Sequence, residues 1–472
     1  MYIARFASGI GNCTADMTSI NKQKDHPAEI RRTLHLAAPV IIGQVAVFSM
    51  SFVDTVMSGR LPNKEVALAG LGIGGAVWSA LLMFTLGILL AVQPSVAQLD
   101  GAGRQEEAGA YTRQAFWIAA AIAIPYWAFC FYAEPFLTWF RIDPVIVPVA
   151  AGYLRALSWG APGICLVFLL RYFSEGTGYT RPTMIYGVLG ALLNIPLNYV
   201  LMFGKLGFPA LGTVGCGIAS AIVIWISVLM LLVYLFKHKH FKPYALFSRF
   251  DAPDWKQISE HLRVGFPIAV SIFVEGSLFV GAALLIGRLG PVPAASHLIA
   301  INFSALAFMI PVGLSSAVSI RVGNAIGRAD PESARYAGLI GIAIVLGFQT
   351  ISASAMLLFP ELIVRMYTDD PAVASLAVSL LFYAAIFQYS DGIQICAAGA
   401  LRGYKDTLMP MVYTIISFWI VGMTLGYYLT FNQGWGPAGM WVGMIAGLST
   451  AAVLMLARFQ RSSRRLIALH RA

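Results

Sequence analysis

One long apolar stretch with a single charge inside it indicates the class of this protein. Residues 264–287 read VGFPIAVSIFVEGSLFVGAALLIG and lie between Arg263 and Arg288. About 20 apolar residues suffice to cross a bilayer as a helix, so this stretch is long enough to span a membrane. Its only charged residue, Glu275, stands near the middle. A carboxylate at that depth costs roughly 2.5–3.5 kcal/mol on insertion scales, so a functional role is the default expectation.

The composition of the whole chain agrees with this interpretation. The 472 residues are 58% hydrophobic and only 11% charged, whereas about 25% of the residues in a soluble domain are charged. The sequence therefore predicts an all-α membrane protein with many spans. The five cysteines form no C-x-x-C pair, which argues against a metal site or a disulfide framework.

Breaks at charged or Gly/Pro-rich points divide the chain into apolar segments. We expect twelve transmembrane helices from them. The approximate spans are 34–58, 65–98, 112–133, 146–173, 182–204, 209–236, 260–287, 294–325, 336–359, 372–400, 407–430 and 436–457.

Lys and Arg residues are distributed unevenly between the two sides. If the N-terminus is inside, 25 of the 32 fall on the cytoplasmic side and 6 outside, while Arg155 lies within a segment. Cytoplasmic loops carry the excess of positive charge, so this bias predicts that both termini are cytoplasmic. It also accounts for the net charge of +10 without a nucleic-acid partner.

The first six segments resemble the last six. LAAPVIIG (36–43) is similar to VGFPIAVS (264–271), which aligns Pro39 with Pro267 at an offset of 228 residues. Gly178-Tyr179 matches Gly403-Tyr404 at an offset of 225. Because six is an even number, the two copies have the same orientation in the membrane. We predict two six-helix lobes related by a pseudo-two-fold axis along the membrane normal, with substrate near the midplane between them.

This repeat gives the predicted domain boundaries. They are a cytoplasmic N-terminal extension at 1–32, an N-lobe at 33–236, a cytoplasmic linker at 237–259, a C-lobe at 260–458 and a basic cytoplasmic tail at 459–472.

Three acids within segments are the first candidates for the chemistry. Glu275 and Asp391 each stand alone in a long apolar segment, and Asp54 is the only acid of the first segment. Burial and a second nearby carboxylate both favour the neutral form of a carboxyl group. Such a group can hold a proton or Na⁺ near neutral pH and release it to a cationic substrate. The alternative is a static acid that is hydrogen-bonded to a neighbouring helix.

Two asparagines form a candidate polar cluster with Asp54. Asn194 and Asn198 are four residues apart in ALLNIPLNYVL, so they share one helical face. Pro196 between them leaves a backbone carbonyl free, and amide and carbonyl oxygens suit a cation. The alternative is hydrogen bonding between helices.

Other residues are candidates for a hinge, for a structural ion pair or for the lining of a cavity. Pro39 and Pro267 occupy matching places in the first helix of each lobe, where each could be a hinge or a static kink. Arg171 and Glu175 have the spacing of a structural i, i+4 ion pair. Phe308 and Met309 are examples of apolar residues that could line an adaptable cavity.

A set of short motifs resembles the MATE (multidrug and toxic compound extrusion) family, in its NorM-like bacterial branch. The motifs occur in family order along nearly the whole chain. They are FVDTVMSG (52–59), LNIPLNYVLMFG (193–204), FPALGTVGCGIAS (208–220), FVEGSLF (273–279), INFSALAFMIP (301–311), AVSIRVGNAIGR (317–328), FQYSDGIQ (387–394), ALRGYKDTLMPM (400–411) and GPAGMWVG (436–443).

The resemblance implies an efflux transporter and not an enzyme. It implies export of hydrophobic organic cations, such as dyes and fluoroquinolone-type drugs, by Na⁺- or H⁺-coupled antiport with alternating access. It places the chain in the bacterial cell inner membrane, in contact with lipid. No cofactor is expected besides the coupling ion, and we expect a monomer.

The resemblance also implies roles for matching positions. Glu275 and Asp391 match the family's second-lobe acids, which bind the coupling cation and compete with drug, so Na⁺ is a candidate ligand there. Asp54, Asn194 and Asn198 match the first-lobe polar cluster. Archaeal members carry an acid in place of Asn198.

A further departure lies one helical turn before Asp391. Some relatives have a tyrosine there, whereas this chain has Phe387. A hydroxyl ligand would then come from Tyr383 or Tyr389.

Two alternatives remain. A lipid-linked precursor flippase of the same superfamily would need a strongly cationic central cavity, and Arg155 is the only arginine well inside a segment. An integral-membrane enzyme would need a metal-binding acid cluster or a His-acid motif, and the seven histidines form none.

Overall fold

The computed structural model describes residues 26–471. This part of the chain is helical, with no strand in it. The helices of the N-half are α2 (His26–Ser58), α3 (Lys64–Leu90), α4 (Val92–Gly101), α5 (Gln105–Phe131), α6 (Ala133–Trp139), α7 (Val147–Ser158), α8 (Ala161–Gly176), α9 (Arg181–Phe203) and α10 (Gly212–Lys237), followed by the short 3₁₀ helix η1 (Lys239–Tyr244). Those of the C-half are α11 (Trp255–Gly287), α12 (Pro291–Gly327), α13 (Pro331–Leu358), α14 (Pro360–Arg365), α15 (Pro371–Gly403), α16 (Leu408–Ile415), the π-helical turn η2 (Ile416–Met423), α17 (Thr424–Tyr427), a second π-helical turn η3 (Tyr428–Asn432) and α18 (Pro437–Arg471).

These helices give the twelve predicted spans. Eleven are long and apolar enough to cross a membrane, and a twelfth forms when α7 and α8 count as one span bent by 50°. The second span, Lys64–Gly101, combines α3 with α4, and the eleventh, Leu408–Asn432, runs from α16 to η3. The prediction of an all-α protein with twelve spans is confirmed for the described residues.

Local sequence signals set where several helices begin. Proline occupies one of the first two positions of α12, α13, α14 and α15, where its missing N–H costs nothing. Asp370 caps α15, because its Oδ1 accepts hydrogen bonds from the backbone N–H groups of Ala372 and Val373. Asp330 caps α13 in the same way through the N–H of Ser333.

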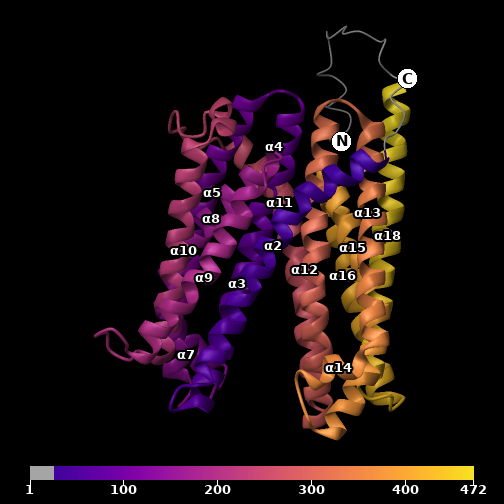
Figure 1. Cartoon of the computed structure of the whole chain (residues 1–472). Helices are drawn as coiled ribbons and strands as arrows, with labels where there is room; N and C mark the ends of the chain where they lie inside the picture. Colours follow the sequence, from indigo (N-terminus) through magenta and orange to yellow (C-terminus); the bar gives the residue numbers. More distant parts are fainter. Residues whose placement is uncertain (1–25, 472) are drawn as a thin grey trace.

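The two ends of the described chain lie on the same side of the molecule. His26 contacts Tyr336, and Arg471 forms an ion pair with Glu332. Both partners belong to the first two turns of α13. In Figure 1 the two helical bundles lie together at this end and spread apart toward the opposite end, where α7 and α14 lie. We call these the terminal end and the far end.

The first helix of each half packs partly into the other half. Val264, Ile268 and Ala269 in the first part of α11 belong to the apolar core of the N-half. Leu278, Ala282 and Ile286 further along α11 belong to the core of the C-half. In the same way, Ala37 of α2 packs with Leu314 and Val345 of the C-half. This reciprocal exchange is the arrangement that a two-fold relation between the halves requires.

The crossing of α3 and α11 depends on small residues. A Cβ atom added to Gly87 would lie 2.3 Å from Cα of Ala269, and one added to Gly265 would lie 2.4 Å from the backbone oxygen of Ile88. Any larger side chain at either glycine would push the two helices apart. The close approach fixes α11 against the N-half immediately before Glu275.

Polar contacts also join the halves at the terminal end. Gln98 of α4 donates to the backbone oxygen of Gly403 at 2.8 Å, and Asn324 of α12 donates to Asp100 at 3.1 Å. Arg321 of α12 pairs with Glu29 of α2 at 2.6 Å. The structure therefore holds the two halves together at the terminal end by both apolar and polar contacts.

The predicted domain boundaries meet the structure in three places. Of the predicted extension, residues 26–32 already belong to α2, and the rest lies outside the described residues. The predicted linker contains η1 and the first turn of α11. The predicted tail continues α18 as a helix as far as Arg471.

Candidate functional site

The two acids of the C-half lie close to each other on α11 and α15. Phe279, one turn after Glu275 on α11, packs edge-on against Phe387, one turn before Asp391 on α15, with ring centroids 6.0 Å apart. The two helices run in opposite directions, so this contact sets Glu275 and Asp391 at the same level. The charges of the two carboxyl groups interact across this gap. Asp391 is 4% exposed and Glu275 is partly buried.

Asp391 and two glutamines on α15 carry buried acceptor oxygens without donors. Its Oδ1 is buried and has no hydrogen-bond partner among the described residues. The same holds for Oε1 of Gln388 and Oε1 of Gln394, which precede and follow Asp391 by one helical turn. Buried polar atoms are nearly always hydrogen-bonded, so three unpaired acceptors within two turns of one helix call for an explanation. A proton on Asp391, or a cation bound beside it, would satisfy its carboxyl oxygen.

Two further polar groups of α15 reach toward Glu275. The Gln394 amide and the Arg402 guanidinium both lie close enough to the Glu275 carboxylate to interact with it electrostatically. Arg402 also donates from Nη2 to Oγ of Ser315 at 2.6 Å. Arg402 stands at the C-terminal end of α15, yet its side chain turns back into the protein.

An aromatic wall closes the far-end side of the acid pair. Trp441 of α18 packs against Phe387, and the His297 ring of α12 packs against Trp441, with ring centroids 5.7 Å apart in both cases. His297 is 3% exposed, and neither of its ring nitrogens has a partner in the described chain. The sequence analysis did not select His297, because a lone histidine in an apolar segment carries no motif.

The predicted N-half cluster also forms. Nδ2 of Asn198 donates to Oδ1 of Asp54 at 2.5 Å and to Oδ1 of Asn194 at 3.1 Å. Cys216 and Ser220 of α10 lie beside the same Asp54 carboxylate. Both asparagines are fully buried, and Oδ1 of Asn198 has no donor among the described residues. Asp54, Asn194 and Asn198 therefore make one cluster, and Glu275 and Asp391 make another.

A small hollow lies between α2 and the C-half. It has a volume of about 290 Å³ and is lined by Val45 of α2, Phe303 and Ile310 of α12 and Gln349 of α13, among others. Nε2 of Gln349 donates to the backbone oxygen of Gln388 at 2.9 Å, so this side chain separates the hollow from the acid pair. The lining comes from neighbours of Phe308 and Met309, not from these two residues themselves.

Arg171 and Glu175 are paired as predicted, but they lie deep inside the protein. Nε of Arg171 donates to Oε1 of Glu175 at 2.7 Å, and the two side chains are 5% and 0% exposed. Thr183 and Gln93 also donate to this carboxylate. Gln93 donates in addition to Ser316 of the C-half at 3.0 Å, which connects the pair to the seam between the halves.

Arg155 does not line a central cavity. Its side chain is 52% exposed on the outer surface of the N-half, where it lies 3.6 Å from Glu134. Arg402 is the arginine that interacts with Glu275, and the buried Arg171 is paired with Glu175. No cluster of three or more His, Cys, Asp or Glu residues that could hold a metal ion occurs within residues 26–471.

The MatE family profile matches the chain twice, over residues 39–200 and 267–428. The chain belongs to the MatE family. The two matches begin at Pro39 and Pro267, so they reproduce the offset of 228 residues that the sequence repeat predicts. The resemblance to this family is thereby confirmed, and the protein is a membrane transporter and not an enzyme.

Relatives of similar length support the assignment. The probable multidrug resistance protein NorM of Xanthomonas campestris is 46% identical over 441 residues, which are 93% of this chain and 96% of the relative. The multidrug resistance protein PmpM of Pseudomonas aeruginosa is 42% identical over 452 residues, which are 94% of each chain.

Solved structures share the fold. The outward-facing structure of a multidrug resistance MATE family transporter of the MOP superfamily superimposes with a TM-score of 0.85 and 19% sequence identity. The match covers 95% of this chain and 100% of that one. The MatE fold therefore extends over nearly the whole chain.

Proposed function

We propose that this protein is a multidrug efflux transporter that exports hydrophobic organic cations in exchange for Na⁺ or H⁺. Its relatives are multidrug resistance proteins of similar length. The proposed location is the bacterial inner membrane, with the terminal end in the cytoplasm. We propose further that the protein acts as a monomer.

One observation carries the coupling mechanism. Oδ1 of Asp391 and the side-chain oxygens of Gln388 and Gln394 are buried acceptors with no donor among the described residues. Unpaired acceptors in a desolvated site cost free energy until a positive charge or a proton meets them. Glu275 adds a second carboxylate close enough to interact with the first. The acid pair therefore favours occupation by a cation, and substrate and coupling ion compete for it.

The exchange follows from that competition. A drug cation enters from the cytoplasmic side and takes the acid pair. The halves then close at the terminal end and spread apart at the far end, so the site opens to the far side, where Na⁺ or H⁺ displaces the drug. Because the pair cannot hold both guests, each cycle exports one and imports the other.

The Arg402 guanidinium has a defined part in this cycle. It interacts with Glu275 while its Nη2 is held by Ser315. It therefore offsets part of the negative charge of the acid pair when no guest is bound, and it keeps the affinity for cations low enough to permit release.

The test is transport by purified protein in liposomes. Ethidium movement is measured with an imposed Na⁺ gradient, with an imposed pH gradient and with neither. We expect uphill ethidium transport with at least one gradient and its loss in Glu275→Gln and Asp391→Asn. Glu361→Gln, which removes an exposed acid of α14, should transport at the wild-type rate. Uphill transport that persists in both acid variants would refute the coupling mechanism.

A further inference from the structure

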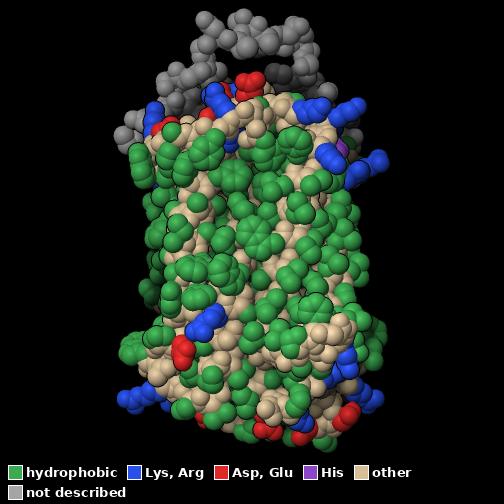
Figure 2. All heavy atoms as spheres, turned by 90° about the vertical axis from the view of Figure 1, so that its left-hand side faces the viewer, with side chains coloured by type: hydrophobic (Ala, Val, Ile, Leu, Met, Phe, Trp, Pro, Cys, Tyr) green, Lys and Arg blue, Asp and Glu red, His purple; other side chains and the backbone are tan. Residues whose placement is uncertain are grey.

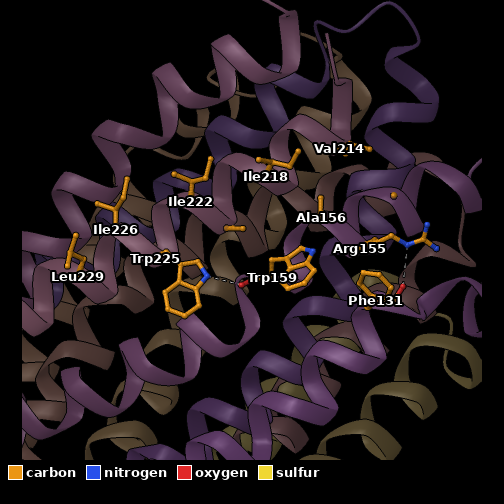
Figure 3. Close-up of a pocket in the computed structure, with 12 residues that line it drawn as sticks. Phe131, Arg155, Ala156, Trp159, Val214, Ile218, Ile222, Trp225, Ile226 and Leu229 are labelled. Carbon is orange, nitrogen blue, oxygen red and sulfur yellow. Dashed lines mark hydrogen bonds between the residues drawn. The ribbon is translucent and has the colours of Figure 1, made fainter. Parts of the chain in front are cut away.

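A groove on the outer face of the N-half is the feature that the transport cycle leaves unexplained. It lies where α7 bends into α8 and has a volume of about 870 Å³. Figure 3 shows that its floor and walls come from α7 and α10, with Trp159, Ile222, Trp225 and Leu229 along it and Arg155 at one end. Trp159 is 60% and Leu229 61% exposed, so the groove opens onto the membrane-facing surface.

Small residues and the helix bend create this groove. Gly152 and Ala156 of α7 and Ala221 of α10 line it where larger side chains would fill it. The bend also leaves the backbone oxygen of Trp159 without its helical partner, and Nε1 of Trp225 donates to this oxygen at 2.9 Å. That hydrogen bond fixes the Trp225 ring along the wall. The polar groups of Trp159 and Trp225 in the groove are therefore hydrogen-bonded to each other, and the rest of the groove surface is mainly apolar.

Arg155 joins the apolar groove to a second, more polar hollow. This hollow has a volume of about 670 Å³ and is lined by Glu134, Thr138, Trp139 and Tyr132, with Arg155 shared between the two. Tyr132 and Trp139 are 66% and 76% exposed. Exposed aromatic residues gather at the level of the lipid headgroups. The polar hollow therefore lies at the membrane interface, and the apolar groove extends from it toward the hydrocarbon.

The charges at the junction are unusual for a membrane-facing surface. Figure 2 shows this face as a broad green belt with charged side chains gathered at its two ends, and a basic and an acidic side chain standing together inside the belt. Arg155 and Glu134 lie 3.6 Å apart, beyond hydrogen-bonding distance, with their side chains 52% and 57% exposed. Of the five N–H donors of Arg155, one makes a long bond of 3.5 Å to the backbone oxygen of Phe131, and the other four make no hydrogen bond within the described residues.

We propose that the groove and the hollow together bind one phospholipid with an ethanolamine headgroup. An acyl chain lies in the groove against Trp159 and Trp225. The phosphate accepts hydrogen bonds from the free N–H donors of Arg155, and the ammonium group donates to Glu134. A cation beside an anion matches a zwitterionic headgroup, whereas an anionic headgroup would meet repulsion from Glu134. A choline headgroup has no N–H to donate, so it fits less well.

The test is a lipid-retention measurement on the full-length protein. The protein is reconstituted in nanodiscs with equal amounts of dioleoyl phosphatidylethanolamine, phosphatidylglycerol and phosphatidylcholine. It is then released into mild detergent, and the retained lipids are identified by native mass spectrometry. We expect one retained phosphatidylethanolamine, favoured over phosphatidylcholine by roughly two- to fivefold, the range for partly exposed charge pairs.

Three variants and a control assign the parts of the site. Arg155→Gln should lose most of the retained lipid, and Glu134→Gln should abolish the preference for ethanolamine over choline. Ala156→Leu should displace the acyl chain and lower retention of every headgroup. The control is Arg288→Gln, which removes an exposed arginine at the far end of the C-half that lies over the Phe431 ring. Its lipid retention should equal that of the wild type.

Two results would overturn the proposal. One is unchanged lipid retention in both Arg155→Gln and Ala156→Leu, which would show that the groove holds no lipid. The other is retention of phosphatidylglycerol that equals or exceeds that of phosphatidylethanolamine, together with no effect of Glu134→Gln. It would show that Arg155 and Glu134 do not select the headgroup. Ethidium binding by each variant checks folding, because none of the changed residues contacts the acid pair.

Discussion

Phe279 of α11 and Phe387 of α15 pack edge-on at 6.0 Å, one helical turn away from Glu275 and Asp391 respectively. This contact explains how two acids 116 residues apart in the chain come to share one site. The first part of α11 is packed against the N-half, so Glu275 sits where this helix passes from one core to the other. A relative movement of the halves would therefore shift Glu275 relative to Asp391.

Removal of either carboxylate charge should weaken cation binding. Glu275→Gln and Asp391→Asn keep the side-chain volume but leave a bound cation without one buried partner. Such a loss costs at least about 2 kcal/mol, which corresponds to a roughly 30-fold rise in Kd. The measurement is equilibrium binding of ethidium to purified variants by fluorescence anisotropy. Wild-type affinity in either variant would remove that acid from the binding site.

The two acids should act as one unit. If a single cation needs both carboxylates, then the Glu275→Gln/Asp391→Asn double variant should bind ethidium little more weakly than the weaker single variant. Independent sites would instead give additive free energies, as distant mutations do. A double-mutant cycle on the same binding assay measures the difference. Additivity within about 0.5 kcal/mol would contradict a shared site.

The N-half cluster offers a gain-of-function test. Nδ2 of Asn198 donates to Asp54, so Asn198→Asp would place two carboxylates in contact. Two buried carboxylates need a cation or a proton between them. We expect this variant to melt at a lower temperature than the wild type in choline chloride at pH 8 and to regain stability in NaCl. Asn198→Ala serves as the control, since it should be destabilised equally in both salts.

The buried ion pair should matter for stability far more than an exposed one. Glu175→Gln would leave the Arg171 charge uncompensated at a position where both side chains are at most 5% exposed. Breaking such a pair costs about 3–5 kcal/mol. The matched control is Glu361→Gln, whose partner Arg365 lies 3.9 Å away with both side chains 77% exposed, where a change of about 0–1 kcal/mol is expected. The measurement is the melting temperature of both variants in detergent. Equal melting temperatures would contradict this prediction.

The matching prolines should affect movement rather than binding. Pro267 lies in the part of α11 that packs on the N-half, and Pro39 lies in the part of α2 that packs on the C-half. If they are hinges, Pro39→Ala and Pro267→Ala should keep ethidium affinity but slow ethidium efflux, because a straightened helix resists the change between states. Efflux at the wild-type rate in both variants would leave the prolines with a static role.

Much of the fold follows from the sequence because lipid imposes simple rules. The spans follow from apolar length, and the two-fold relation follows from the match of Pro39 with Pro267. The grouping of Asp54 with Asn194 and Asn198 was also predictable, since the two asparagines share a helical face and belong with the acid of the first segment. Their roles in coupling remain predictions.

Other parts of the site could not be read from the chain. Gln388 and Gln394 are ordinary polar residues in sequence, and only the packing shows that their oxygens lack donors. Arg402 lies at the end of its segment, yet its side chain folds inward to Ser315. The crossing of α11 between two cores depends on contacts of Gly87 and Gly265 with residues far away in the chain, which carry no local signal.

The most direct test of the central claim is ethidium binding to the wild-type protein as a function of Na⁺ concentration and pH, with Glu275→Gln measured alongside. If drug and coupling ion compete for the acid pair, the apparent Kd for ethidium should rise in proportion to the concentration of Na⁺ or of H⁺, and this dependence should disappear in Glu275→Gln. An ethidium affinity that is independent of both ions in the wild-type protein would contradict the account.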